Sequence, residues 1–209
     1  MRVALLSLGC VTLLVMWWGP LPQLAKHAFF AHMTMHMGVV AVAAPLVALG
    51  IAGGRFDPVR IAPAAFAPVP ASILELVVVW AWHAPALHLA ARHTATGLIA
   101  EQGTFLLTGL LLWLSAFGGR SDTGTGRTAA GVVGLLLTSM HMTLLGALLA
   151  LAPRPLYPHE GFAGISPLED QHLGGAIMLL VGGVSYLFGG LWLTVGLLQR
   201  SRIQFGKQT

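Results

Sequence analysis

Residues 29–50 read FFAHMTMHMGVVAVAAPLVALG and contain no Asp, Glu, Lys or Arg. A helix of this length can cross the roughly 30 Å hydrocarbon core of a bilayer. Only His32 and His36 give the run a titratable character, and imidazoles inside a membrane segment are costly and usually face a partner or a cavity. The stretch therefore predicts a membrane-spanning helix that carries a polar site near its first end.

The composition extends this prediction to the whole chain. Of the 209 residues, 56% are hydrophobic and only 9% are charged, whereas soluble domains carry about 25% charged residues. We therefore predict an all-α, polytopic membrane helix bundle embedded in lipid. The net charge of +4 is spread thinly between apolar runs, which argues against a nucleic-acid-binding surface.

Apolar runs separated by Pro- and Gly-rich breaks predict about six transmembrane helices in a single membrane domain covering 1–209. The sequence Ser166-Pro167-Leu168-Glu169 is typical of a capping box, in which Ser166 and Glu169 play structural roles at the start of the last helix. Glycines that recur along that helix predict close packing against its neighbours. The predicted spans are about 3–18, 29–50, 70–91, 97–117, 129–151 and 170–198.

The distribution of basic residues predicts the orientation. With the N-terminus inside, 8 of the 11 Lys and Arg residues fall on the cytoplasmic side and 3 outside, namely Lys26, Arg92 and Arg154. Cytoplasmic loops carry an excess of Lys and Arg. Both termini are therefore expected in the cytoplasm.

In this orientation the histidines fall on the outer side of the membrane, in two layers. With 1.5 Å per residue, His36, His83 and His141 lie roughly 11 to 15 Å below the outer boundary. His32, His88 and Glu101 lie at roughly 5 to 6 Å, with Asp170 and His172 at the rim. We predict that the deep triplet binds one metal ion, that His32 and His172 can also ligate it, and that Glu101 and Asp170 belong to the outer shell and access route.

Other polar residues are expected to have plainer roles. His88, His93 and His159 lie close to or beyond the predicted interface, where solvated or headgroup contacts are favoured over ligation. Glu75 is expected to snorkel to the cytoplasmic interface. Four methionines beside the histidines are either core filler or soft ligands, and they are Met33, Met37, Met140 and Met142.

The ligand types favour copper. One cysteine, Cys10, excludes an intramolecular disulfide and a thiolate cage, whereas imidazole with thioether suits Cu(I). Haem b is the alternative, because two histidines on facing helices can ligate it from both sides. Copper permeation would need polar groups that continue inward, and below His36 the second span is apolar.

Four segments give the chain a resemblance to a known family. They are H-M-T-M-H-M at 32–37 followed by A-P-L-V-A-L-G, W-A-W-H-A-P-A-L at 80–87, L-L-G-A-L-L-A-L-A-P-R-P-L-Y-P at 144–158, and S-P-L-E-D-Q-H-L-G-G-A-I-M at 166–178. In combination they resemble the CtaG family of multi-span cytochrome c oxidase assembly factors. That family commonly has a His after the fourth-helix glutamate, where this chain has Gln102, and many of its members have a seventh helix.

The resemblance implies a protein that supports maturation of a haem-copper oxidase by handling copper outside the cytoplasm. It would lie in the bacterial cytoplasmic membrane, and its partners would be oxidase subunits and periplasmic copper chaperones. We expect a metallochaperone and not an enzyme, because no activated nucleophile or acid–base pair is evident. The sequence leaves a homo-oligomer open.

Overall fold

The computed structural model describes residues 1–119, 125–157 and 164–205, and every regular element in this part of the chain is a helix. Two π-helical segments, η1 (Gly38–Ala43) and η4 (Met178–Gly182), interrupt longer helices, and η2 (Pro58–Arg60) and η3 (Pro63–Ala65) are short 3₁₀ turns. The α-helices are α1 (Arg2–Trp18), α2 (Leu21–Leu24), α3 (Phe29–Met37), α4 (Ala44–Ile51), α5 (Pro68–Trp82), α6 (Pro85–His93), α7 (Ala95–Phe117), α8 (Thr125–Ala150), α9 (Pro167–Ile177) and α10 (Gly183–Phe205).

The predicted helical membrane bundle is confirmed in its coarse form. Four helices are long and apolar enough to cross a membrane, or five if the bent pair α5–α6 forms one span. α1 is apolar but has only 17 residues, so the count of six spans stays a prediction. The four long spans are Phe29–Ile51, Ala95–Phe117, Thr125–Ala150 and Pro167–Gln199.

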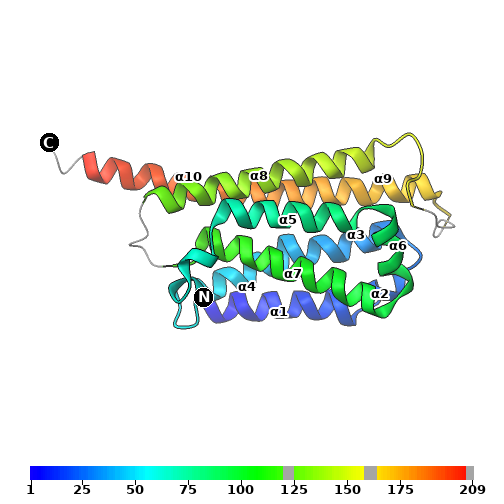
Figure 1. Ribbon diagram of the computed structural model, residues 1–209, viewed down its shortest axis with the longest axis horizontal. Coiled ribbons are helices and arrows are strands. Elements are labelled where there is room, and N and C mark those ends of the chain that lie inside the picture. The colour runs from blue at the N-terminus through cyan, green and yellow to red at the C-terminus, as the bar shows by residue number, and fades with distance from the viewer. Residues whose placement is uncertain (120–124, 158–163, 206–209) are drawn as a thin grey trace.

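The long helices run side by side along one axis (Figure 1). The start of α1 and the end of α10 lie at the same end of the bundle, and α2, α6 and the start of α9 lie at the opposite end. The two ends of a chain lie on the same side of a membrane when the chain crosses it an even number of times. The side of the membrane that each end faces stays a prediction.

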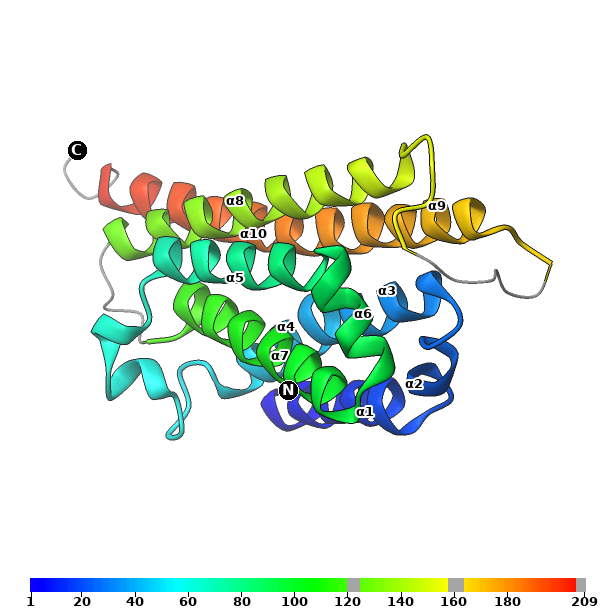
Figure 2. The same cartoon turned by 45° about the vertical axis from the view of Figure 1, so that its right-hand side comes forward.

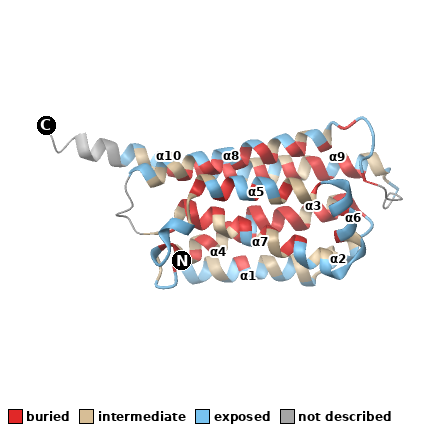
Figure 3. Ribbon diagram, viewed as in Figure 1, coloured by how far each residue is buried: buried red, intermediate tan, exposed pale blue. Residues whose placement is uncertain are grey.

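Apolar side chains point both inward and outward. Figure 3 shows buried residues where spans face one another, as along α3. Large apolar residues are also exposed on the outer faces, including Leu148 of α8 at 53% and Trp192 of α10 at 66%. Such extensive apolar exposure would be a liability in water, and lipid is the environment that suits it.

The third predicted span is wrong as a continuous helix. α5 ends at Trp82, α6 begins at Pro85, and the two axes are bent by 73°. Proline disfavours the helical conformation in the residue before it, and Ala84 accordingly has an extended backbone (φ −65°, ψ 133°). Figure 2 shows α6 turning across the end of the bundle, away from the direction of α5.

The π-helical segment η1 accepts hydrogen bonds from two other helices, α7 and α10. In η1 the carbonyl of Val40 accepts hydrogen bonds from Trp113 Nε1 (3.3 Å) and Tyr186 Oη (3.3 Å), and the carbonyl of Ala41 accepts one from Ser185 Oγ (2.7 Å). A π turn loosens the regular hydrogen-bond pattern of the helix and is frequent at functional sites. Here the carbonyls of η1 are available to α7 and α10.

The predicted features of the last helix are mostly confirmed. Ser166 and Glu169 form the capping box, with Ser166 N donating to Glu169 Oε2 (2.8 Å). A Cβ at Gly175 would lie 2.4 Å from the Ala150 nitrogen of α8, so the two backbones touch there. Gly196 has no neighbour within 4 Å of a Cβ and is not a packing glycine within this chain.

Glu75 does not snorkel as predicted. Its side chain is fully buried and accepts a hydrogen bond from Tyr186 Oη at 2.7 Å. Ser72 Oγ and Thr138 Oγ1 form a second buried hydrogen bond of 2.8 Å between α5 and α8. Polar groups thus continue below the histidines, on spans other than the second.

Candidate metal centre

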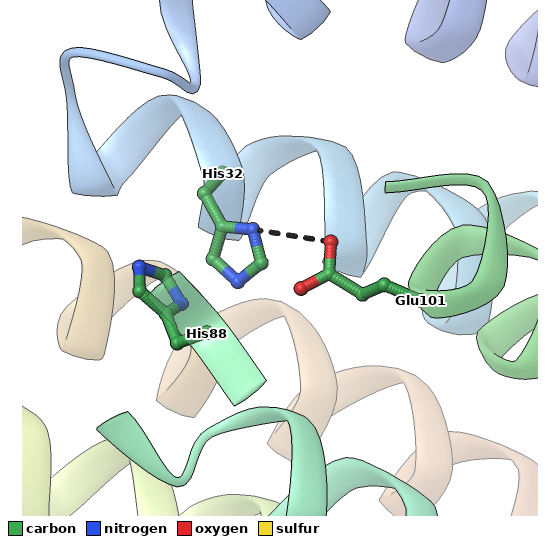
Figure 4. Close-up of side chains that lie close together, drawn as sticks. All are labelled: His32, His88 and Glu101. Carbon is green, nitrogen blue, oxygen red and sulfur yellow. Dashed lines mark ion pairs between the residues drawn. The ribbon is translucent and has the colours of Figure 1, made fainter. Parts of the chain in front are cut away.

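Three side chains from three helices converge at the end of the bundle that holds α2 and α6. His32 of α3, His88 of α6 and Glu101 of α7 are all buried, and one ligand atom of each lies within 4.8 Å of the other two (Figure 4). Two atoms that each bind an ion at about 2 Å can be at most about 4 Å apart. Small side-chain movements would therefore let the three bind one ion.

Two further imidazoles extend this group inward. The His36 and His83 ring centroids are 5.3 Å apart, and the His32 ring lies 4.8 Å from that of His88 and 5.9 Å from that of His83. We call these four residues, His32, His36, His83 and His88, the histidine cluster. They lie on α3, at the end of α5 and on α6, so the bend between α5 and α6 is what brings them together.

The first turn of α3 is held by a carboxylate from α9. Ala28 provides no side-chain cap. Instead Asp170 Oδ2 accepts a hydrogen bond from Phe29 N (2.7 Å) and Oδ1 accepts one from Phe30 N (2.8 Å). A carboxylate at a helix N-terminus satisfies free amide groups and favours the helix dipole, so Asp170 fixes the turn from which His32 projects.

The ring of His83 is oriented by its backbone. Its Nδ1 lies 2.6 Å from the carbonyl oxygen of Val79, and because a carbonyl only accepts, Nδ1 must carry the proton. The Nε2 lone pair of the neutral ring is then available to a metal. The Tyr157 hydroxyl donates to the His83 carbonyl (2.8 Å), and burial raises the pKa of that hydroxyl, which keeps it a donor.

Several imidazole nitrogens in this region have no hydrogen-bond partner among the described residues. Both ring nitrogens of His32, His36 and His141, and Nε2 of His83, are buried without a hydrogen bond among the described residues. Leaving a buried polar group unsatisfied costs about 1–3 kcal/mol, and native proteins leave few of them. A set of unsatisfied imidazoles in adjoining positions fits a metal ion that uses their lone pairs.

Glu101 is shared between the cluster and an arginine. Arg92 Nη2 donates to Glu101 Oε2, Gln102 Nε2 donates to the same oxygen (3.1 Å), and His32 Nδ1 lies 3.7 Å from it. Gln102 Oε1 also accepts from Trp17 Nε1 of α1 (3.3 Å). The glutamine that differs from the expected family pattern therefore positions Glu101 and connects the site to α1.

The structure groups the histidines differently from the sequence prediction. The predicted ligand triplet is His36, His83 and His141, with His32, His88 and Glu101 in a shallower layer, whereas the three residues closest to a ligand arrangement are those of the shallower layer. His88 was expected at the interface but is only 6% exposed, because the bend before α6 turns it toward α3. His141 is buried on α8, next to this region, with no ring contact to the cluster in the described part of the chain.

The four methionines considered as soft ligands differ in burial. Met33, Met37 and Met142 pack in the hydrophobic core. Met140 is 69% exposed. Ligation by any of these thioethers stays a prediction.

The rim residues also have structural partners. Both carboxylate oxygens of Asp170 are bonded to α3, and His172 Nε2 lies 2.9 Å from the carbonyl oxygen of Ala152. The structure thus gives each a role in holding the end of the bundle. His93 is exposed, as expected, and His159 lies outside the described residues.

Arg92 and Tyr157 also belong to the site, where the sequence predicts neither of them. Arg92 was counted only as a base on the outer side, and Tyr157 stacks on Phe29 (ring centroids 4.7 Å) and packs against His88 (4.3 Å). The spacing of Arg92 four residues after His88, on the same helix face, was the available signal.

Taken together, these features define a multi-pass helical membrane protein with a buried histidine and carboxylate centre at one end. The chain belongs to the cytochrome c oxidase caa3 assembly factor family (Caa3_CtaG), whose model matches residues 1–200. No curated protein and no solved structure matches the chain. Family membership carries an assembly role, and association with cytochrome c oxidase and the membrane.

Proposed function

We propose that this protein binds copper at the histidine cluster and supports its insertion into a haem-copper cytochrome c oxidase from the outer side of the membrane. The observation that carries the proposal is that buried imidazole nitrogens of His32, His36 and His83 have no hydrogen-bond partner among the described residues, next to the group of His32, His88 and Glu101. The family supplies the assembly role. Periplasmic copper chaperones would be the donors, in the cytoplasmic membrane of a bacterium.

The charges around the site favour Cu(I). Burying a charge is costly unless it is compensated, and Glu101 is already paired with Arg92. The remaining ligands are imidazoles, which bind metals in their neutral form. A monovalent ion therefore costs less to bury here than a divalent one, an argument that does not need the thioethers.

Haem b is less well accommodated. Phe105 lies against His36 with ring centroids 4.0 Å apart, and the imidazoles of the cluster are themselves neighbours. A porphyrin ring between two axial histidines would have to displace these side chains. An intense Soret band with stoichiometric iron would nevertheless overturn the copper proposal.

The proposal is tested by elemental analysis and an absorption spectrum of protein purified without added metal. We expect copper and a featureless visible spectrum, because the filled d shell of Cu(I) gives no d–d bands. His32→Ala and His88→Ala should lose the copper. His172→Ala, which removes an imidazole outside the cluster at the same end of the bundle, is the matched control and should keep it.

A further inference from the structure

A cavity of about 690 Å³ opens beside the histidine cluster. Its wall is formed by the segment that joins α2 to α3, by α6 and by the start of α7, together with Tyr157. His88 belongs both to this wall and to the candidate ligand group. The cavity is of the size that small molecules occupy in proteins, and His88 places it next to the candidate ligand group.

The wall of the cavity is basic. Lys26 and Arg92 line it with three histidines, and no Asp or Glu is among its described lining residues. Lys26 is exposed. A free metal cation that entered here would meet like charge, whereas an anion would be attracted.

Arg92 connects the cavity with the ligand group. Its side chain is only 8% exposed, Nη2 pairs with Glu101, and Nη1 is 3.5 Å from the Ala25 carbonyl oxygen. Its Nε and the Oε1 atom of Glu101 are buried, and neither has a hydrogen-bond partner among the residues that the structure describes. A buried charge that loses its partner is strongly destabilising, so the charge of Glu101 becomes fully available to a metal when another anion pairs with Arg92.

We propose that the cavity receives copper as a small anionic complex and that Arg92 exchanges Glu101 for the anionic ligand of that complex. This inference rests on the proposed function and names the chemistry of its substrate. The bond between copper and the carrier ligand breaks, and bonds to Glu101 and to the His32 and His88 nitrogens form. The released anion pairs with Arg92, copper keeps its oxidation state, and no proton moves.

The experiment compares two copper(I) donors of opposite charge, the anionic thiosulfate complex and the cationic acetonitrile complex. Full-length metal-free protein in detergent is mixed with each donor, and bound copper is measured over time after rapid gel filtration. Lys26→Gln and Arg92→Gln are compared with wild type. Arg154→Gln, which removes an exposed charge outside the cavity in the loop before α9, is the matched control.

Loading from thiosulfate should slow by about threefold or more in Lys26→Gln and should also slow at higher ionic strength. In Lys26→Gln, copper loading from the acetonitrile complex should be unchanged or faster. Arg92→Gln should accelerate loading from this complex, because Glu101 is then a free anion. Arg154→Gln should match wild type with both donors.

The inference is overturned if the variants change the rates of loading from the two donors in the same direction, or change neither rate. The proposed copper binding would stand in that case. A wild-type protein that retains no copper from either donor defeats the proposed function itself, and the inference with it. Because Lys26 is exposed, its variant keeps the test valid even if Arg92→Gln does not fold.

Discussion

At the scale of single residues, the buried hydrogen bond of Glu75 leads to a prediction about stability. Its buried carboxyl is bonded to Tyr186, and no Lys or Arg pairs with it in the described part of the chain. Glu75→Gln keeps a hydrogen-bonding group of the same shape and removes any charge, so it should cost little. Glu75→Ala leaves Tyr186 without this partner and opens a cavity, and should cost about 2 kcal/mol or more, measured as unfolding in detergent.

Glu169→Gln is the control for Glu75, because this carboxylate is exposed and its hydrogen bonds are those of the capping box. A Glu75→Gln variant that unfolds as easily as Glu75→Ala would show that the charge itself is required.

The residues of the centre could be predicted only in part. Hydropathy and helix spacing brought out His32, His36 and His83, because each lies on an apolar helix where an imidazole is unexpected. Depth along a straight helix placed His88 in the same layer as His32 and Glu101, but the sequence did not indicate that the bend before α6 turns it toward them. Arg92 and Asp170 act across helix ends, through partners nine or more residues away. A single sequence does not reveal these pairings, although the spacing of Arg92 four residues after His88 puts the two on one helix face.

At the scale of helices, Asp170 of α9 caps the start of α3, and this contact leads to a second prediction about stability. Asp170→Ala removes the acceptors of one buried and one partly buried amide group and should cost about 2 kcal/mol. Ser166→Ala removes an exposed cap of α9 and should cost about 1 kcal/mol or less. Thermal unfolding of the two variants compares them, and equal losses would contradict the role assigned to Asp170.

The bend between α5 and α6 leads to a third prediction, which concerns copper binding. Pro85→Ala removes the constraint on Ala84 and lets α5 continue as a helix, which would move His88 away from His32. Copper content should fall while the protein stays folded, as judged by far-ultraviolet circular dichroism. Pro22→Ala, in the short helix α2 at the same end, is the control, and a full copper content in Pro85→Ala would show that the bend has another cause.

For the whole molecule, a metal that binds only the folded state must stabilise it. At a free copper concentration 100 times the Kd, the expected gain is about 2.7 kcal/mol. The melting temperature of wild type should rise with added Cu(I), and that of His32→Ala should not. Equal shifts in both proteins would place the bound copper outside the histidine cluster.

The membrane architecture was the most predictable part of the molecule. The four long spans follow from runs of apolar residues that have few alternatives in a bilayer, and each lies within a few residues of its predicted bounds. The bend at Pro85 and the π segments were not predicted. They depend on which neighbouring groups satisfy the backbone, as Trp113 and Tyr186 do for Val40, and that information is not local.

The π-helical segment η1 has a consequence for insertions and deletions. Each residue of an α-helix advances the side-chain direction by about 100°, so the extra residue of a π turn sets the angular phase of α4 relative to α3. Ala44 now faces Gly109 of α7, and Val47 faces Gly9 of α1. Loss of a single codon within Gly38–Ala43 would keep every histidine yet rotate these contacts toward lipid, and should disrupt the bundle more than any one substitution there.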